Sequence, residues 1–276
     1  MIRSRKSSAM RSLCAVIVCS AALIWAPERA AAGQACSETP ISVKNLANAM
    51  DAAQRVTAEL DKRQIEVALL ARMGQDLSAY GLRYSHVGFV YRAQPGAPWR
   101  IVHLLNACGT GESDLWYEGV GNFFLDDMFR FDALLLIPSK PVADILRTRL
   151  SQANALRATF DNRYSMIAYP FSTRYQNSNT WVLETLASVE AKDAKIDNRE
   201  KAQAWLKLAG YQPSEMHIRP FKRLGGRMFK ANVAFDDHPN ELRFSDRIRT
   251  VTVDSVQKFL LARQEGWETV ELPAPR

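Results

Sequence analysis

The stretch Arg83-Tyr84-Ser85-His86-Val87-Gly88-Phe89 places one histidine in a run of aromatic and β-branched residues, a composition typical of a strand. A similar run at residues 100–106 carries His103. Between them, Gln94-Pro95-Gly96-Ala97-Pro98 has the proline and glycine content of a turn. We therefore expect two neighbouring strands that each carry a histidine, held rigidly and able to face a cleft.

Apolar periodicity predicts the other elements. Further strands are expected at residues 67–72, 131–138 and 248–253, and helices at 42–60, 142–155, 178–189 and 202–208. The pattern indicates an α+β fold with a mainly antiparallel sheet packed against helices. The charged stretch 190–200 is the best candidate for a linker, so we expect a core at residues 33–190. A C-terminal extension, residues 191–276, would pack on it.

The N-terminus has the composition of a secretory signal, predicted as residues 1–32. Basic residues Arg3, Arg5, Lys6 and Arg11 precede an apolar stretch at 13–25, and Ala30-Ala31-Ala32 offers small residues for cleavage. The apolar stretch is too short to cross a bilayer as a helix, although an uncleaved anchor is the alternative. The sequence thus predicts a periplasmic or secreted protein with no transmembrane anchor after cleavage.

Export changes the charge of the chain. The full sequence carries a net charge of +7, with 36 basic and 29 acidic residues. Residues 1–32 contain five basic residues and one acidic residue, so the mature chain keeps about +3. The basic residues show no cluster interleaved with aromatic residues, and we therefore expect no nucleic-acid partner. No glycine-rich phosphate loop follows a strand, and no cofactor is expected.

Two of the four cysteines, Cys14 and Cys19, lie within the predicted signal. The remaining pair, Cys36 and Cys108, favours one disulfide bond in an exported chain. The alternative makes Cys108 a reactive nucleophile, but a lone reactive thiol is unusual in an oxidising compartment.

The polar segment Gln176–Glu184 begins the helix expected at 178–189. The first N–H groups of a helix have no internal partner, and they can stabilise an oxyanion next to a nucleophile such as Ser178. His86 could then serve as general base and His103 could orient it. The simpler interpretation is that the histidines are structural and that Asn177, Ser178 and Asn179 only cap the helix.

The histidine strand Tyr84-Ser85-His86-Val87-Gly88-Phe89 resembles that of circularly permuted, NlpC-type papain-like hydrolases. In that group the histidine strand comes first, a polar orienting residue follows on the next strand, and a cysteine comes late at a helix start. The stretch 177–182, Asn-Ser-Asn-Thr-Trp-Val, is similar to the group's Asp-Cys-Ser-Gly-Leu-Val type of motif, with Ser178 in the cysteine position.

This resemblance implies a papain-like core and amide or ester cleavage through a covalent acyl-enzyme, on cell-wall peptides or lipids. Its site would contain His86, His103 and Ser178 as catalytic residues. Substrate-cleft candidates near these motifs are Tyr84, Arg174, Asn177 and Asn179. Serine in place of cysteine is a departure, because serine is a poor nucleophile until a base removes its proton.

The mature chain also resembles, more closely and over most of its length, an exported bacterial family known as domain of unknown function 2145. The residues that carry this resemblance are 81–89, 102–106, 121–127, 175–179 and 232–239.

Three hypotheses follow. The first is an exported amide or ester hydrolase acting in the cell envelope through His86, His103 and Ser178. The second is a non-catalytic protein that binds an unknown envelope ligand in a degenerate papain-like cleft. The third is a metal-dependent hydrolase built around Asp236, Asp237 and His238, to which Asp126 and Asp127 could add oxygen ligands. Such runs are more often solvated turns, and we expect no metal.

Overall fold

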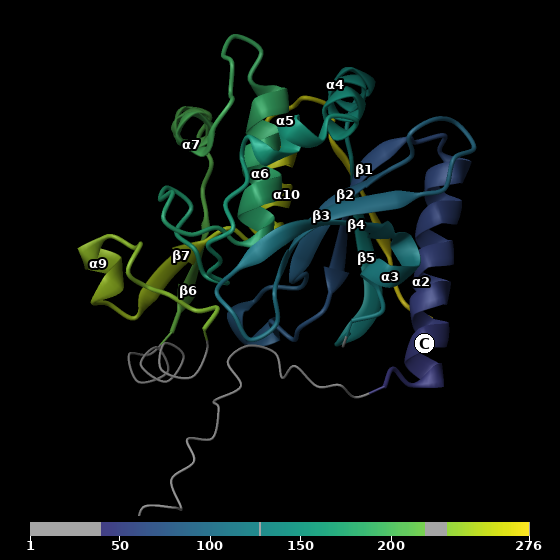
Figure 1. The fold of residues 1–276 in the computed structure, drawn as a ribbon, viewed down its shortest axis with the longest axis horizontal. Coiled ribbons are helices and arrows are strands. Elements are labelled where there is room, and N and C mark those ends of the chain that lie inside the picture. The colour runs from purple at the N-terminus through teal and green to yellow at the C-terminus, as the bar shows by residue number, and fades with distance from the viewer. Residues whose placement is uncertain (1–39, 127, 219–230, 276) are drawn as a thin grey trace, which may run out of the picture.

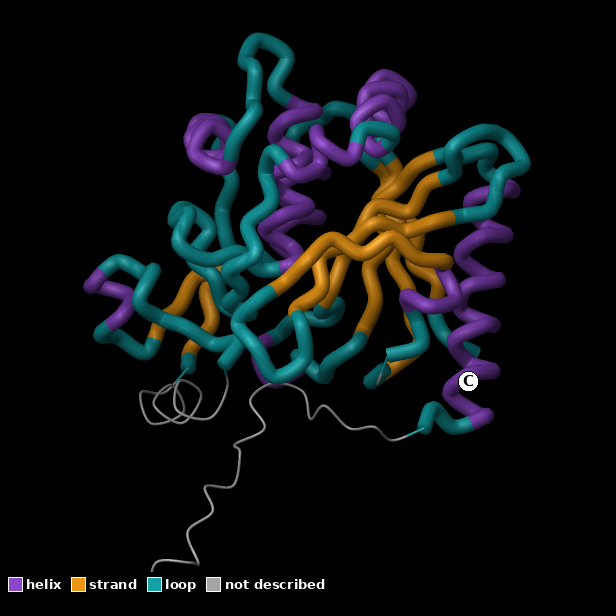
Figure 2. Tube along the Cα trace, viewed as in Figure 1, coloured by secondary structure: helices purple, strands orange, loops and turns teal. Residues whose placement is uncertain are grey.

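A computed structural model describes residues 40–126, 128–218 and 231–275. Its centre is a six-stranded antiparallel sheet with the strand order β4-β3-β2-β1-β5-β8 (Figures 1 and 2). The strands are β1 (Val67–Met73), β2 (His86–Tyr91), β3 (Arg100–Asn106), β4 (Ser113–Gly119), β5 (Arg130–Ile137) and β8 (Glu268–Leu272). A two-stranded ribbon of β6 (Ser214–His217) and β7 (Arg247–Thr250) lies apart from it.

Helices pack on both faces of the sheet. The helices of the described residues are α2 (Val43–Lys62), α3 (Val120–Phe123), α4 (Lys140–Leu150), α5 (Ala153–Arg157), α6 (Ser178–Glu190), α7 (Arg199–Leu208), α9 (Asn240–Arg243) and α10 (Val253–Ala262), with a short 3-10 turn η1 (Ser78–Tyr80). Helices α2 and α3 cover one face, and α4, α6 and α10 lie on the other (Figure 1). The predicted α+β class, an antiparallel sheet packed against helices, is therefore confirmed.

The central strand β1 is buried along its whole length because both faces of the sheet are covered. Its side chains alternate: Val67, Leu69 and Ala71 join the core beneath α4, α6 and α10, and Ala68 and Leu70 join the core beneath α2 and α3. A strand covered on both faces has a continuous apolar run in place of alternating polar residues. This explains why the sequence made β1 easy to predict.

The two edge strands were not predicted. In β4 the consecutive residues Trp116 and Tyr117 point to opposite faces and are both exposed, so the strand shows no clean alternation of buried apolar and exposed polar residues. In β8 no residue is fully buried, and two of the five residues are glutamates. Strand β8 pairs with β5, and the described part of residues 191–276 therefore completes the main sheet, across the boundary expected at residue 190.

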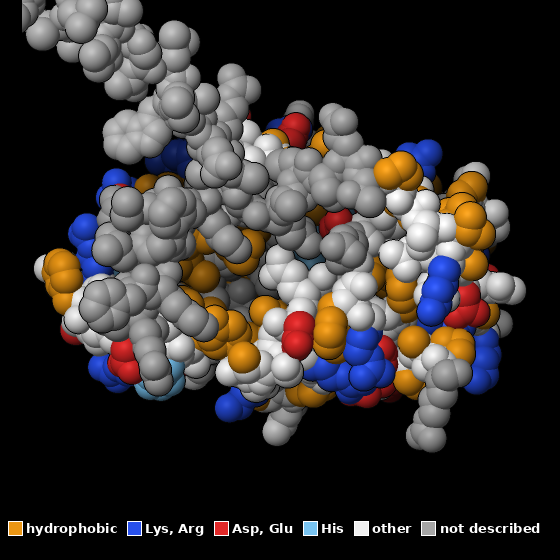
Figure 3. Space-filling view, turned by 90° about the horizontal axis from the view of Figure 1, so that it is seen from below, with side chains coloured by type: hydrophobic (Ala, Val, Ile, Leu, Met, Phe, Trp, Pro, Cys, Tyr) orange, Lys and Arg blue, Asp and Glu red, His pale blue; other side chains and the backbone are white. Residues whose placement is uncertain are grey.

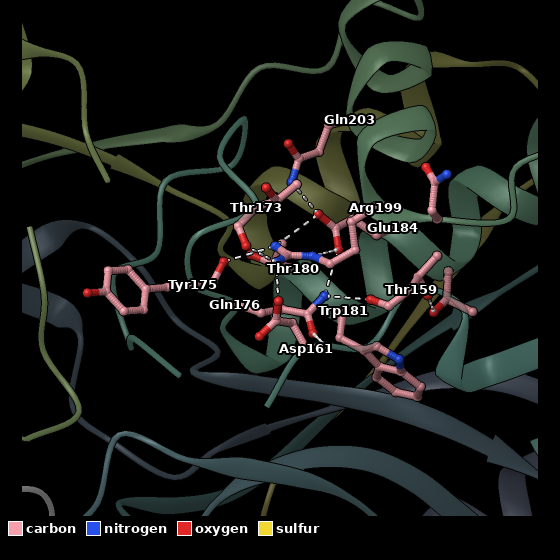
Figure 4. A network of polar contacts seen from close by, with 12 residues as sticks. Thr159, Asp161, Thr173, Tyr175, Gln176, Thr180, Trp181, Glu184, Arg199 and Gln203 are labelled. Atoms are coloured by element: carbon pink, nitrogen blue, oxygen red, sulfur yellow. Dashed lines mark hydrogen bonds and ion pairs between the residues drawn. The ribbon is translucent and has the colours of Figure 1, made fainter. Parts of the chain in front are cut away.

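A buried polar network holds the loop that leads into α6 (Figure 4). The carboxylate of Glu184 accepts hydrogen bonds from Arg199 (2.8 Å), Gln176 (2.6 Å) and Gln203 (2.7 Å). Arg199 also donates to the carbonyls of Thr173 and Tyr175, each at 2.9 Å. A charged pair inside a protein must be satisfied by such additional hydrogen bonds. The network thereby fixes where the N-terminus of α6 begins.

The start of α6 is capped in the way that the sequence suggested. The side chain of Asn177 accepts a hydrogen bond from the N–H of Thr180 at 2.7 Å, and its amide donates to the hydroxyl of Thr250 at 3.0 Å. Ser178 is the first residue of the helix. Asn177 is therefore a structural cap that connects α6 to the end of β7.

In the part of the chain that the structure describes, no helix combines the length and the apolar character needed to cross a membrane. The described residues do not include the predicted signal at 1–32, Cys36 or Asp127. They also leave out the stretch 224–227, Leu-Gly-Gly-Arg, whose two glycines predict a tight turn.

Candidate active site

A cavity of about 500 Å³ lies at one end of the sheet. The start of β2, the end of β3, the segment after α3 and the N-terminus of α6 all contribute to it. Figure 3 shows the molecule from below, where hydrophobic and charged side chains are interspersed on the described part of the surface. The cavity brings together the three predicted catalytic residues, because His86, His103 and Ser178 all line it. Its size is that of a site for a small molecule or for the end of a longer one.

The two histidines are in direct contact, and a carboxylate extends the chain. The distance from His86 Nε2 to His103 Nδ1 is 2.8 Å, and the distance from His103 Nε2 to Glu118 Oε1 is 2.7 Å. His103 is fully buried and His86 nearly so. The side chains therefore form a continuous row of hydrogen bonds across β2, β3 and β4.

The row follows from the register of the sheet. Every second residue of each strand points toward α2 and α3. Val90 of β2 and Ile101 of β3 are two of these residues, and both are buried in the core on that face. His86 and His103 are an even number of positions from these two residues and therefore point to the same face. Both rings contact Phe123 of α3, at centroid distances of 5.7 and 5.2 Å. The histidine rings are thus held between the sheet and α3, with one edge at the cavity.

The carboxylate determines which nitrogens carry protons. An ionised carboxylate only accepts hydrogen bonds, so His103 must donate its Nε2–H to Glu118. In a neutral imidazole this leaves Nδ1 of His103 as an acceptor, and His86 must donate Nε2–H to it. The neutral ring of His86 then carries its lone pair on Nδ1. The arrangement provides a base at the nitrogen that His103 does not use.

The electrostatic environment favours the neutral form of both rings. Burial, with a contribution from the Arg72 cation, lowers the pKa of His86 well below its usual value. Burial also lowers the pKa of His103, but the hydrogen bond to Glu118 opposes this shift. Arg72, on β1, donates to the carboxylate of Asp126 at 2.8 Å and to the carbonyl of Phe123.

Gly88 is required by the position of His103. A Cβ atom at Gly88 would lie 2.8 Å from Cβ of His103 and 2.9 Å from the carbonyl oxygen of Val102. Because these are backbone-anchored atoms, the strands would have to move apart. Gly88→Ala is expected to lower the free energy of unfolding by about 1–3 kcal/mol, as overpacking does. Urea denaturation measures it, with Gly119→Ala as control, since a Cβ there meets nothing within 4 Å. If the Gly88→Ala and Gly119→Ala variants had equal free energies of unfolding, the close approach of β2 and β3 at Gly88 would be contradicted.

Ser178 reaches the cavity from the other side. Tyr164 also lines the cavity. Burial raises the pKa of its phenol, and the Ser178 side chain opposes this rise. The neighbouring Asn179 donates to the carbonyl of Ser85 at 3.4 Å, so the start of α6 lies beside the residue that precedes His86. The fold thus brings together two motifs separated by about ninety positions in the sequence.

The four predicted substrate-cleft residues are not among those that line this cavity. Tyr84 is buried, and burial raises its pKa to about 12. Arg174 forms an ion pair with Asp236 at 2.7 Å. Asn177 and Asn179 are buried at the start of α6, where their amides bond to neighbouring loops and strands.

The cluster at Asp236, Asp237 and His238 is internally bonded. His238 Nδ1 lies 2.8 Å from Asp237 Oδ1, and Nε2 lies 3.0 Å from the carbonyl oxygen of Arg249. Within residues 40–126, 128–218 and 231–275, no three or more histidine, cysteine or acidic side chains are grouped to hold a metal ion. The side chains therefore connect the 231–240 segment to β7.

Cys108 lies among the residues around the cavity. Its proposed partner, Cys36, lies outside the described residues, so the Cys36–Cys108 disulfide stays a prediction.

Three residues of the site were not found by sequence reasoning. Glu118 lies on the unpredicted strand β4, and Tyr164 lies between α5 and α6, in a segment to which the sequence assigned no functional residue. Arg72 had a visible signal, since it is the one charged residue in the apolar run of β1. A buried charge in such a strand needs a partner, and this could have led to Asp126.

The fold and the site define an α+β protein whose sheet carries a hydrogen-bonded histidine pair in a cavity, opposite the N-terminus of a helix. The chain belongs to a bacterial family described as "Uncharacterized protein conserved in bacteria (DUF2145)", whose model matches residues 59–260. No curated protein and no solved structure matches the chain.

Proposed function

We propose that this protein is an exported hydrolase of amide or ester bonds that acts in the cell envelope. One observation carries the proposal: His86, supported by His103 and Glu118, lines the same cavity as Ser178 at the N-terminus of α6. A nucleophile, a base and a group that orients the base are the components of acyl transfer. The export signal predicted at residues 1–32 is the reason for placing the protein in the envelope.

In the proposed reaction the hydroxyl of Ser178 attacks the acyl carbon of the substrate. Its proton passes to Nδ1 of His86, and the first N–H groups of α6 stabilise the oxyanion. Collapse of the intermediate leaves an acyl group on Ser178 and returns the proton to the departing amine or alcohol. A water molecule, activated by His86 in the same way, then releases the acid.

The same arrangement supports a permuted papain-like core. A histidine strand, a second strand with its orienting residue and a late helix start occur in the order β2, β3, α6. We assign Ser178 to the position that a cysteine holds in NlpC-type hydrolases. The expected substrates are then cell-wall peptides or lipids.

The test is labelling with a fluorophosphonate probe, which reacts with activated serines. We expect one adduct, located on Ser178 by mass spectrometry of peptides. Ser178→Ala should abolish it. Ser188→Ala, on the same helix, should retain it, because the Ser188 hydroxyl is already bonded to the carbonyl of Thr185. No adduct on the wild-type protein, or an adduct that persists in Ser178→Ala, would reject the assignment.

A second candidate is a non-catalytic binding protein that uses the same cavity for an envelope ligand. The observation that favours it is that the His86 ring packs against Phe123 on the face of the sheet covered by α2 and α3, whereas Ser178 belongs to α6 on the other face. If this candidate holds, Ser178→Ala will replace the wild-type protein fully in cells that lack it. If the hydrolase holds, the variant will fail to do so.

A further inference from the structure

The histidine pair lies between a buried cation and a carboxylate. Arg72 on β1 is the register partner of His86 on β2, so the guanidinium group and the imidazole ring stand on neighbouring strands of the same face. At the other end, Glu118 on β4 bonds to His103. The order across the sheet is therefore Arg72, His86, His103, Glu118.

A positive charge is not equally stable on the two rings. On His86 it would face the Arg72 cation, and on His103 it would face the Glu118 carboxylate at 2.7 Å. Inside a protein such interactions are much stronger than in water. The contact of 2.8 Å between the two rings is short enough for a proton to pass along it.

We propose that His86 and His103 act as one proton acceptor, in which the proton taken by His86 ends as a positive charge on His103, and that Glu118 is the positioning residue of this unit. A bond forms between the incoming proton and His86 Nδ1. The Nε2–H bond of His86 breaks as its proton passes to Nδ1 of His103. His103 keeps its own Nε2–H, donated to Glu118, and becomes the imidazolium. His86 stays neutral, with its proton now on Nδ1.

This inference rests on the proposed function only for the source of the proton, which is the Ser178 hydroxyl. The charged groups around the pair are Arg72, Asp126 and Glu118. Asp126 is paired with Arg72 at 2.8 Å, which offsets part of the cation's effect without removing it. Phe123 covers both rings from α3 and limits the access of water.

The directions of the pKa shifts agree with this order. The Arg72 cation, after burial, lowers the pKa of His86. Burial lowers the pKa of His103 too, but the bond to Glu118 raises it. As the pH falls, His103 should therefore accept a proton before His86 does.

The first test is nitrogen-15 NMR of the folded protein labelled at histidine, since the full sequence has four histidines. We expect both rings to carry the proton on Nε2 at neutral pH and His103 to protonate first on acidification. In Glu118→Gln this order should be lost, because a neutral amide can donate as well as accept. Asp114→Asn, which removes an exposed carboxylate from the same strand, should leave it unchanged.

The second test is the pH dependence of fluorophosphonate labelling at Ser178. Glu118→Gln should slow labelling by about 10- to 100-fold, part of the 10²- to 10⁴-fold that a general base supplies. Because the carboxylate raises the pKa of His103, its loss should move the acid limb of the profile to lower pH. A purely structural role for Glu118 would not move that limb.

The two tests separate the inference from the proposed function. A wild-type protein that takes no label rejects Ser178 as a nucleophile, and the NMR titration then still decides the inference. A proton on Nδ1 of either neutral ring, or protonation of His86 before His103, overturns the shared acceptor. So does a Glu118→Gln variant with an unchanged histidine titration.

Discussion

Replacing His86 with glutamine is expected to lower the rate of fluorophosphonate labelling at Ser178 by about 10²- to 10⁴-fold, the range that a general base contributes. The glutamine amide can still donate to Nδ1 of His103, which keeps the hydrogen bond that His86 makes at 2.8 Å. It cannot accept a proton. The variant therefore removes the base while preserving the buried contact.

The matched control is His217→Gln. His217 is exposed and pairs with Asp246 at 3.2 Å, away from the cavity. Labelling of this variant should equal that of the wild-type protein, and thermal unfolding should show both variants folded. If a folded His86→Gln protein were labelled at the wild-type rate, His86 would not be the base.

Replacing Arg199 with leucine is expected to lower the free energy of unfolding by about 3–5 kcal/mol, because it leaves a buried carboxylate without its cation. Glu184 is fully buried and Arg199 nearly so (Figure 4). The loss should also free the carbonyls of Thr173 and Tyr175, which Arg199 holds. Urea denaturation followed by circular dichroism measures the change.

The loss of unfolding free energy in Arg199→Leu should grow as the pH rises. Burial raises the pKa of Glu184, and Arg199 opposes this rise most strongly, followed by the hydrogen bonds from Gln203 and Gln176. Without Arg199 the folded-state pKa of Glu184 rises further above its unfolded value. Stability is then greater below the ordinary pKa range of glutamate and falls as the pH rises. The Arg199→Leu variant should therefore be closest to the wild-type protein in acid.

Two further variants separate the buried pair from surface effects. Lys201 lies on the same helix as Arg199 and forms an exposed ion pair with Asp197, which precedes the helix. Lys201→Ala should change the free energy of unfolding by no more than about 0.5 kcal/mol. Combining Arg199→Leu with Glu184→Leu should recover much of the loss, since no unpaired charge remains. A loss for Arg199→Leu that is as small as that for Lys201→Ala would show that the network contributes little.

Much of the fold could be predicted from local patterns. The strands β1, β2, β3 and β5 were found because each is a run of apolar residues, and α2 and α6 because their caps, Ser42 and Asn177, precede a periodic apolar face. The turn between β2 and β3 was found from its proline and glycine residues, and Gly96 adopts a positive φ there.

The edges of the sheet could not be predicted in this way. Strand β4 has one neighbour, β3, and exposes Trp116 and Tyr117, so its residues do not report which side is buried. Strand β8 pairs with β5, which lies far from it in the sequence. Arg55 of α2 helps to hold this edge by donating to the carbonyl of Leu272 at 3.1 Å. Pairing at a sheet edge depends on which strand edges remain without a partner once the rest of the chain has folded.

The candidate site, too, could be predicted only in part from local sequence patterns. By itself the sequence determined that two adjacent strands each present a histidine and that a capped helix begins at Ser178, because strand and helix periodicity are local properties of the chain. Only the tertiary structure decided that His103 meets Glu118, that Arg72 stands opposite His86, and that the helix start faces the same cavity. These contacts are set by strand register and by the packing of helices on opposite faces of the sheet, which neighbouring residues in the chain do not encode.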